Sequence, residues 1–341
     1  MPDNDLWKYC TAEHCKELLL SFRLFGNTAW TGEKQVACLY ALSRHIGKHY
    51  ARAVIPKRDG SARYLLVPDP LLKQVQKNIL YHVLAEIPVS PHATAYHPKA
   101  NVIANATPHL RQPQVLRLDI EDFFGTITFP MVYSQAFPYV YFPPSVRTLL
   151  THLCCYRDYL PQGAPTSAAI SNLVLKPFDD HMGRWCSERG IAYTRYCDDM
   201  VFSGDLDARV VKNKVQNFLQ AMGFSLNLKK TRLSTRHQQQ VVTGLVVNEK
   251  VQAPVQYRKA LRKEIYFCQK YGVQSHLTQT ADQTYLPHGH NGVMRYLASL
   301  LGKVNFVLQA NPQDAYFQQA KSAIQHMRAQ FLTHTGTLST L

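Results

Sequence analysis

Two adjacent carboxylates interrupt an apolar stretch of the chain and restrict how this stretch can fold. Asp198 and Asp199 stand between the runs 191–193 and 200–202, each of which has the composition of a β-strand. Because adjacent side chains on a strand point to opposite faces, both acids converge only where the backbone turns. We therefore predict a β-hairpin over 191–203 with the acidic pair at its tip. Two neighbouring negative charges repel, so the pair marks either a solvated turn or a cation site.

A third carboxylate favours the cation site. In the stretch 115–120, the apolar residues Leu116, Leu118 and Ile120 share one face of a predicted strand, and Asp119 projects from the other face. A carboxylate on a largely buried strand is costly unless it is paired or bound to metal. Three carboxylates at a strand and a hairpin tip match a site for two Mg²⁺ ions, which activate an attacking hydroxyl and stabilise a leaving pyrophosphate.

The composition indicates a nucleic-acid partner. The 341 residues include 38 Lys and Arg against 23 Asp and Glu, a formal net charge of +15. This excess favours a polyanion, nucleic acid before an anionic membrane, and the alternative is a basic protein without such a partner. No apolar stretch reaches the roughly 20 residues that span a bilayer, and the N-terminus lacks a signal-peptide core, so we expect a cytoplasmic protein with no membrane partner. The eight cysteines form no Cys-x-x-Cys pair, and we expect reduced thiols rather than zinc ligands.

Hydrophobic periodicity divides the chain into a helical N-terminal part, a mixed middle and a helical C-terminal part. The first 50 residues predict two helices, the second of them capped by Thr31. Residues 53–67 predict a β-hairpin, and Asp69-Pro70 has the chemistry of a helix start. The further predicted elements are a strand over 115–120, a helix from Thr166 through Leu175, a helix from Asp207 to Gly223 and a mostly helical region after Pro254.

Three segments resemble successive motifs of the reverse transcriptases, in that family's order and at compatible spacing. They are Leu-Asp-Ile-Glu-Asp-Phe-Phe at 118–124, Leu-Pro-Gln-Gly-Ala-Pro-Thr-Ser at 160–167 and Tyr-Cys-Asp-Asp at 196–199. The resemblance implies an α+β right-hand polymerase, with an antiparallel palm sheet between fingers and a helical thumb. We therefore expect N-terminal helices and fingers over 1–114, a palm over 115–248 with a fingers segment around 135–175, and an RNA-binding thumb over 249–341.

The resemblance also implies which residues carry the chemistry. Asp119, Asp198 and Asp199 would be the catalytic carboxylates and the ligands of two Mg²⁺ ions, and the backbone of Ile120 would complete the ligand set. Cys197 stands where the family more often has Ala, which leaves the metal ligands intact.

Several basic and polar residues would contact the incoming nucleotide by the same resemblance. Lys57 and Arg63 would grip the triphosphate, because cationic donors suit phosphates whose charge the metals only partly cancel. Gln162 would contact the sugar, and Gly163 would allow close backbone approach. For the first pair the alternative is a solvated basic turn, and for the second it is a plain loop before a helix.

Two further nucleotide contacts are implied. Phe124 sits where the family has its steric gate, a ring packed against C2′ that would clash with the 2′-hydroxyl of a ribonucleotide. Because Phe123 and Phe124 are adjacent, we expect one ring in the core and the other at the gate if the segment is a strand. Lys230 would protonate the departing pyrophosphate, or it is a surface lysine.

Two short elements narrow the resemblance to bacterial retron reverse transcriptases. They are Asn-Ala-Thr-Pro-His at 105–109 and Val-Thr-Gly at 242–244. Within them, Asn105, His109, Thr243 and Gly244 would contact RNA or primer. In the thumb, a basic cluster would bind RNA phosphates, or it is a solvated helix face; its members are Arg258, Lys259, Arg262 and Lys263.

A retron enzyme copies a structured non-coding RNA encoded beside it, starting from a 2′-hydroxyl of an internal guanosine. Its product is multicopy single-stranded DNA, a branched RNA–DNA molecule. The resemblance thus implies a cognate non-coding RNA, its DNA product and deoxynucleoside triphosphates as partners, with a separate effector protein in anti-phage defence. The alternatives are a reverse transcriptase of another bacterial lineage (group II intron-like or abortive-infection type) and an RNA-binding scaffold that controls an effector.

Overall fold

The computed structural model describes residues 6–56, 60, 62–98 and 100–336. The chain divides into two compact units. One comprises Met1–Asn101 with Gln114–Leu233, and the other comprises Val102–Pro113 with Ser234–Leu341. Each unit has its own hydrophobic core.

The first unit begins with helices that start largely where the sequence predicts. Thr31 Oγ1 accepts a hydrogen bond from Lys34 N at 3.4 Å, and Asp69 Oδ1 accepts one from Leu72 N at 2.8 Å, which confirms both predicted caps. Pro70 then occupies the first helical turn, where its missing N–H costs nothing. The helices that pack together here are α1 (Ala12–Ser21), α2 (Gly32–Arg44), α3 (Pro70–His82) and α7 (Pro144–Cys154).

The predicted hairpin after α2 is present. Strands β1 (Tyr50–Pro56) and β2 (Ala62–Pro68) pair antiparallel along their whole length, from Tyr50 opposite Pro68 to Pro56 opposite Ala62. Lys57 lies outside the described residues, whereas Arg63 is on β2. The short helices η1 (Ile46–His49) and η2 (Leu84–Glu86) flank the hairpin and α3.

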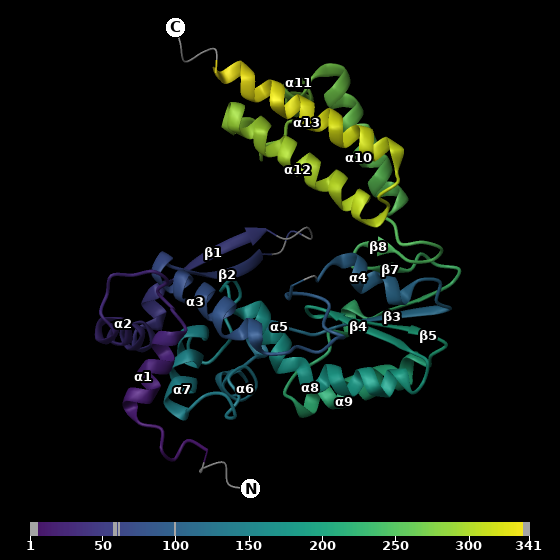
Figure 1. Cartoon of the computed structure of the whole chain (residues 1–341). Helices are drawn as coiled ribbons and strands as arrows, with labels where there is room; N and C mark the ends of the chain where they lie inside the picture. The colour runs from purple at the N-terminus through teal and green to yellow at the C-terminus, as the bar shows by residue number, and fades with distance from the viewer. Residues whose placement is uncertain (1–5, 57–59, 61, 99, 337–341) are drawn as a thin grey trace. The chain divides into compact units, whose positions relative to one another are not determined.

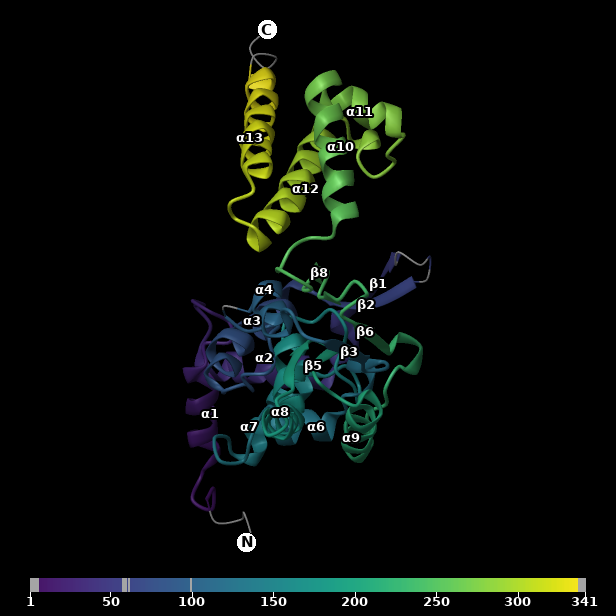
Figure 2. The same cartoon turned by 90° about the vertical axis from the view of Figure 1, so that its right-hand side faces the viewer.

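A four-stranded sheet, the central sheet, carries the acidic residues. Its strands are β3 (Gln114–Asp119), β4 (Ala192–Tyr196), β5 (Asp199–Gly204) and β6 (Arg232–Thr235), in the spatial order β4-β5-β3-β6. β5 pairs antiparallel with both β3 and β4, so that Leu118 lies opposite Met200 and Leu116 opposite Phe202. Helices α8 (Ser167–Ser187) and α9 (Ala208–Ala221) cover one face of the sheet (Figures 1 and 2).

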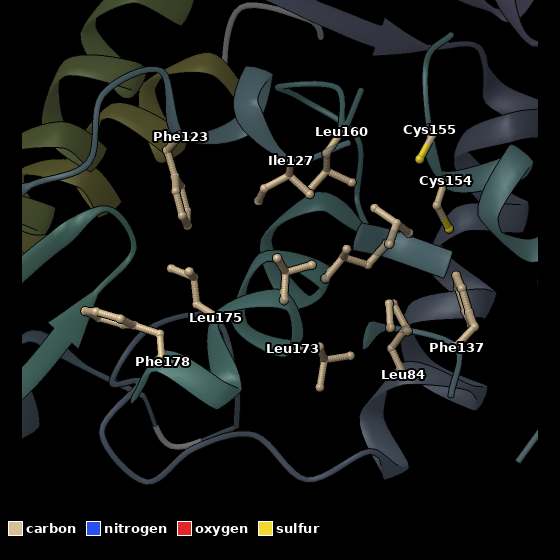
Figure 3. Packing of buried hydrophobic residues seen from close by; sticks show 14 of the residues in the cluster. Leu84, Phe123, Ile127, Phe137, Cys154, Cys155, Leu160, Leu173, Leu175 and Phe178 are labelled. Atoms are coloured by element: carbon tan, nitrogen blue, oxygen red, sulfur yellow. The ribbon is translucent and has the colours of Figure 1, made fainter. Parts of the chain in front are cut away.

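The loops and short helices that follow β3 fill the core beside α8. Figure 3 shows Phe123, Ile127 and Leu160 facing the part of α8 that carries Leu175 and Phe178, all of them buried. The elements in this region are α5 (Phe123–Thr126), α6 (Phe129–Gln135) and the 3₁₀ turn η4 (Leu228–Lys230).

Two local predictions need correction. The helix predicted from Thr166 through Leu175 continues to Ser187 despite Pro177, and the Thr166 side chain makes no cap hydrogen bond. Phe123 and Phe124 lie on the helical turn α5, not on a strand. The reason is Asp122, whose backbone takes a left-handed conformation with φ of +39° and turns the chain out of the sheet.

The second unit is mostly helical, as predicted for the region after Pro254. Its helices are α4 (Val102–Ala106), η3 (Thr107–His109), α10 (Val255–Tyr271), α11 (Val273–Thr280), η5 (Leu286–His288), α12 (Gly289–Ala310) and α13 (Ala315–Gly336). α12 and α13 run side by side (Figures 1 and 2). A two-stranded hairpin of β7 (Val241–Val242) and β8 (Leu245–Val246) precedes the bundle. Among the described helices, none is long and apolar enough to cross a membrane.

Candidate active site

The predicted acidic hairpin is formed by β4 and β5. Tyr196 pairs with Asp199, which leaves Cys197 and Asp198 as a two-residue loop. Cys197 has φ of +63°, a conformation that hairpin loops of this length require and that glycine adopts more readily. Asp198 therefore lies in the loop itself, and Asp199 is the first residue of β5.

The sheet register brings the third acid to the same place. Asp119 ends β3 directly opposite Asp199 on β5, on the face of the sheet opposite to Leu118. The N–H of Ile120 donates a hydrogen bond to the carbonyl of Asp198 at 3.1 Å, which ties the end of β3 to the loop. The three predicted carboxylates thus converge although Asp119 is remote from the other two in sequence.

Two cationic side chains contact the acids. Lys230 Nζ lies 2.9 Å from Asp119 Oδ1 and 3.0 Å from Oδ2, and Arg117 Nη2 lies 3.2 Å from Asp199 Oδ2. Burial raises the pKa of Asp119, to which Asp198 and Asp199 add while Lys230 opposes the shift. Burial also raises the pKa of Asp199, and Arg117 opposes that shift. The local excess of negative charge is therefore only partly neutralised by the protein.

The residues fit a divalent cation in their chemistry. Carboxylate oxygens are hard donors that suit Mg²⁺. Asp119 is only 6% exposed, and its Oδ1 accepts no hydrogen bond of good geometry although Lys230 lies within ion-pair distance. Over the described ranges, no group of three or more His, Cys, Asp or Glu side chains is placed to hold a metal as it stands. Lys230 and Arg117 take part of the space and charge around the acids instead.

A cavity of about 1010 Å³ opens over the acids, large enough for a nucleotide. It lies wholly within the first unit. Its wall brings together segments that are far apart in the sequence: β2, the loop at Tyr96, the end of β3 with α5, the loop before α8, the β4–β5 turn, and the stretch with Asn227 and Lys230. The predicted site residues on this wall are Arg63, Asp119, Ile120, Phe124, Gln162, Asp198, Asp199 and Lys230.

Gln162 and Gly163 hold the loop before α8 against β2. The N–H of Leu66 donates a hydrogen bond to the carbonyl of Gln162 at 2.8 Å. Gly163 has φ of +123°, and a Cβ at this position would lie 2.7 Å from the carbonyl oxygen of Leu66. The close approach that Gly163 permits is therefore to the backbone of β2, and Gln162 faces the cavity.

The two phenylalanines lie on a helical turn and not on the strand for which the division into core and gate was predicted, but their exposure still differs. Phe123 is 4% exposed and belongs to the core, whereas Phe124 is half-buried and packs against Phe123 with ring centroids 5.2 Å apart. Both rings reach the cavity wall, and Phe124 is the more accessible of the two. Its role as a steric gate stays a prediction.

The two short elements that suggested RNA contacts meet each other inside the second unit. Asn105 Nδ2 donates a hydrogen bond to Thr243 Oγ1 at 3.3 Å, and Thr243 Oγ1 donates one to the carbonyl of Val102 at 3.4 Å. Thr243 and Gly244 form the β7–β8 turn, with φ of +46° and +82°. Asn105 and His109 are fully buried, and burial lowers the pKa of His109 to about 4.

The burial of Asn105 and His109 argues against the direct contact with RNA or primer that was predicted for these two residues. A fully buried side chain has no surface for RNA, and a neutral imidazole adds no charge for a phosphate at neutral pH. Asn105 supports the β7–β8 turn through its hydrogen bond to Thr243, and His109 is buried in the same unit. Contact of Thr243 and Gly244 with RNA or primer stays a prediction.

The basic cluster lies on α10 of the second unit. Lys259, Arg262 and Lys263 are exposed, and Arg258 is half-buried. The guanidinium of Arg262 lies 4.9 Å from the ring centre of Tyr316, a cation–π contact that holds it against α13. Whether this cluster binds RNA stays a prediction.

Arg117, which contacts Asp199, and Tyr96, which lines the cavity, were not predicted from the sequence. Arg117 alternates with Asp119 on β3, and this period of two was a signal that both share a face. Tyr96, whose hydroxyl lies 3.1 Å from Cys197 Sγ, comes from a loop about one hundred positions away and left no pattern in the sequence.

Residues 55–260 match the family model of the reverse transcriptases, described as RNA-dependent DNA polymerases. The Retron Ec86 reverse transcriptase of Escherichia coli is 33% identical over 220 residues, which cover 63% of this chain and 68% of that protein. The chain belongs to the bacterial retron reverse transcriptases. The Retron Mx65 reverse transcriptase of Myxococcus xanthus is 32% identical over 273 residues, which cover 71% of this chain and 64% of that protein.

This membership confirms the right-hand α+β fold that the motifs predict, and the antiparallel central sheet agrees with it. The boundaries of fingers, palm and thumb stay a prediction. Among solved structures, a telomerase from Candida albicans matches with a TM-score of 0.42 and 10% identity, over 86% of this chain and 66% of that chain. That likeness is too distant to add to the family assignment. The matched region spans about two thirds of each of the two retron relatives named above.

Proposed function

We propose that this retron reverse transcriptase is an RNA-directed DNA polymerase that joins deoxynucleotides by two-metal nucleotidyl transfer. The observation that carries the proposal is the convergence of Asp119, Asp198 and Asp199 at one cavity that also contains Arg63 and Lys230. Carboxylates can bind the metal ions of a metal-bound triphosphate. Cationic side chains can bind its phosphate oxygens, because the metals cancel only part of the phosphate charge. Family membership supports the same activity.

In this mechanism Asp119, Asp198, Asp199 and the backbone of Ile120 would hold two Mg²⁺ ions. When bound, the ions supply activation of the attacking hydroxyl and neutralisation of the leaving pyrophosphate.

The chain itself contributes mainly positioning of the nucleotide, as in other phosphoryl transfers. Gln162 orients the sugar, Phe124 excludes a 2′-hydroxyl, and Arg63 holds phosphate oxygens, together with Lys57, which lies outside the described residues. The hydrogen bond to Asp119 raises the pKa of Lys230 above the ordinary value of a lysine, so this side chain stays protonated. Lys230 then supplies a proton to the pyrophosphate oxygen.

The retron relatives support a more specific function. We infer that the protein copies part of a cognate structured non-coding RNA into multicopy single-stranded DNA that stays joined to the RNA through a 2′-linked branch. The net charge of +15 and the basic face of α10 favour such a polyanionic partner. A role in anti-phage defence with a separate effector protein is part of the same proposal.

The polymerase activity is tested with poly(rA) primed by oligo(dT), deoxythymidine triphosphate and Mg²⁺. Asp198→Asn removes one carboxylate charge at nearly constant shape, and Asp205→Asn makes the same change at an exposed position that does not line the cavity. Groups that stabilise developing charge contribute about 10²–10³-fold each, so we expect a loss of about 100-fold or more for Asp198→Asn only. Equal rates for both variants would refute the metal-site assignment.

The retron function is tested on nucleic acid that copurifies with the protein when its gene is expressed with its flanking DNA. We expect a DNA strand that stays attached to RNA under denaturing conditions and separates after treatment with a debranching enzyme. Recovery of cellular RNA alone, without attached DNA, would contradict the retron proposal while leaving the polymerase proposal open to its own test.

A further inference from the structure

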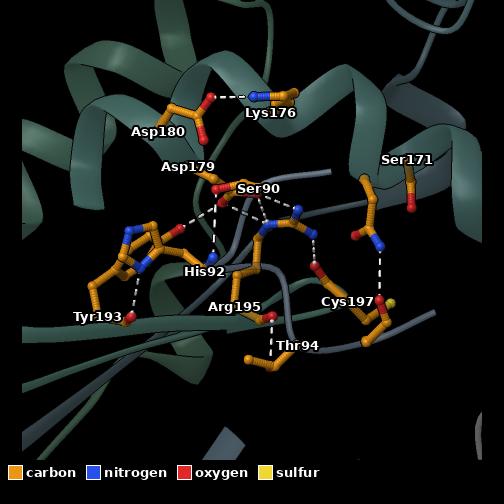
Figure 4. A network of polar contacts seen from close by, with 12 residues as sticks. Ser90, His92, Thr94, Ser171, Lys176, Asp179, Asp180, Tyr193, Arg195 and Cys197 are labelled. Atoms are coloured by element: carbon orange, nitrogen blue, oxygen red, sulfur yellow. Dashed lines mark hydrogen bonds and ion pairs between the residues drawn. The ribbon is translucent and has the colours of Figure 1, made fainter. Parts of the chain in front are cut away.

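A fully buried ion pair joins α8 to the strand that leads into the acidic turn. Asp179 on α8 and Arg195 on β4 are both 0% exposed. Arg195 Nε donates to Asp179 Oδ1 at 2.9 Å and to Oδ2 at 3.2 Å, and Nη2 also contacts Oδ2. The hydroxyl of Tyr193 donates to Asp179 Oδ1 at 2.7 Å (Figure 4). The carboxylate is thus satisfied by two side chains of β4.

The third nitrogen of the guanidinium serves a different partner. Arg195 Nη1 donates a hydrogen bond to the carbonyl of Cys197 at 2.8 Å, as Figure 4 shows. Cys197 is the loop residue with φ of +63°, and Asp198 follows it directly. Because this carbonyl belongs to the peptide unit that ends at the nitrogen of Asp198, the bond restrains the orientation of the backbone from which the Asp198 carboxylate projects.

The backbone of Arg195 is restrained as well. Its N–H donates to the carbonyl of His92 at 2.8 Å, and its carbonyl accepts from Thr94 N at 2.8 Å and from Thr94 Oγ1 at 3.0 Å. Residues 92–94 thereby cover the free side of β4, which is one of the two edge strands of the central sheet. Arg195 therefore has little freedom to move, and neither does the carbonyl it binds.

Stability alone gives no reason for this arrangement. Burying two charges has a large desolvation cost, and replacing a buried ion pair by apolar residues of similar volume is often neutral or stabilising. An apolar pair would fill the space between α8 and β4, but it has no donor for the carbonyl of Cys197. Two hydrogen bonds thus distinguish the ion pair from an apolar pair: the one that Asp179 accepts from the Tyr193 hydroxyl on β4, and the one that Arg195 donates to the loop. Only the second reaches the acidic turn.

We propose that Arg195, oriented by Asp179, is a positioning residue that fixes the Cys197–Asp198 turn and thereby the placement of the Asp198 carboxylate. The proposal rests on the proposed function, in which Asp198 holds metal. Arg195 points to the α8 face of the sheet, opposite to the face of Asp119, so it touches neither nucleotide nor metal. Partners that orient metal ligands in this way contribute about 10–100-fold to metal affinity or activity.

The test uses the full chain with the apolar double variant Asp179→Leu/Arg195→Met. The matched control is Lys176→Met/Asp180→Leu, which removes an ion pair on the same helix with side chains that are 36% and 28% exposed. Urea denaturation measures stability, and electron paramagnetic resonance measures Mn²⁺ binding in the presence of deoxythymidine triphosphate. DNA synthesis is then followed against Mg²⁺ concentration.

We expect the double variant to fold, to bind Mn²⁺ about 10–100-fold more weakly and to need correspondingly more Mg²⁺ for half-maximal synthesis. The control variant should keep the metal dependence of the unmodified protein. A folded double variant with unchanged Mn²⁺ affinity and unchanged Mg²⁺ dependence would overturn the proposal.

Arg195→Lys keeps the test decisive if the double variant does not fold. Lysine retains a charge for Asp179 but has one nitrogen in place of three, so it cannot reproduce both the carboxylate contacts and the bond to Cys197. We expect weaker Mn²⁺ binding here too, and unchanged binding by the folded variant would overturn the proposal. If Asp198→Asn also synthesises DNA normally, the assignment of Asp198 to the metal site is wrong; if only the Arg195 variants do, the positioning role alone is wrong.

Discussion

Gly163 offers a sharp test of how the loop before α8 is held, because its backbone and its surroundings both exclude a side chain. Its φ of +123° lies in a region that residues with a Cβ rarely adopt, and the added Cβ would stand 2.7 Å from the carbonyl oxygen of Leu66. In Gly163→Ala the loop must therefore move away from β2. The hydrogen bond from Leu66 N to the Gln162 carbonyl, 2.8 Å long, is then weakened or lost.

The magnitude follows from these two contributions. Holding a residue in a sparsely populated backbone region costs about 1–3 kcal/mol. Loss of one hydrogen bond adds about 1 kcal/mol. We expect Gly163→Ala to lower the free energy of unfolding by about 2–4 kcal/mol. Because Gln162 and Arg63 lie on the two segments that separate, the KM for deoxynucleotides should rise more than kcat falls.

Urea denaturation and steady-state kinetics measure both effects. Gly47→Ala is the control, since no atom lies within 4 Å of a Cβ placed there and its φ is not in the left-handed region. Such a substitution is neutral or slightly stabilising, because it restricts the unfolded chain. If Gly163→Ala unfolds at the same urea concentration as Gly47→Ala and has an unchanged KM, the packing argument for this loop is refuted.

Three other changes test separate parts of the molecule. Phe124→Ala should raise incorporation of ribonucleotides relative to deoxynucleotides by about 10-fold or more in primer extension, because it removes the bulk expected at C2′; an unchanged ratio would exclude Phe124 as the gate. Lys230→Met should lower kcat by about 100-fold while the neighbouring exposed Lys229→Met does not, and equal rates would exclude proton donation. Burial lowers the pKa of His109 from 6.5 to about 4, so the folded state favours the neutral ring, and stability should fall by about 3 kcal/mol as the pH drops from above 6.5 to 4. His109→Gln should lack this pH-dependent loss in urea titrations, and an identical slope in both proteins would contradict it.

Local chemistry predicted much of the fold. Caps such as Asp69, followed by proline, act through neighbouring backbone groups, so the sequence contains both partners of the interaction. The hairpin over 191–203 was predicted for the same reason, since its apolar strands and acidic turn are contiguous. The extension of α8 past Pro177 was missed because tertiary packing overrides the local signal of a proline.

Contacts between remote segments could not be predicted in the same way. The family resemblance named Asn105 and Thr243 as separate RNA contacts, but their hydrogen bond to each other is a property of the fold, and Asn105 is fully buried. The pairing of Asp179 with Arg195 has the same character, because neither residue is unusual for a helix or a strand. Only the three-dimensional arrangement reveals that both are enclosed.

The two faces of the central sheet hold different charged groups near the acidic turn. On one face, Asp119 and Asp199 stand side by side with Lys230 and Arg117 within ion-pair distance, and burial raises the pKa of both acids. Because like charges at short range are unfavourable, repulsion between Asp198 and the two neighbouring acids favours movement of the turn away from them. On the other face, Arg195 holds the carbonyl of the turn from a position shielded from solvent, where a hydrogen bond to a charged donor is strongest. A restraint on the face away from the acids opposes this movement without placing another cation where the metal ions would bind.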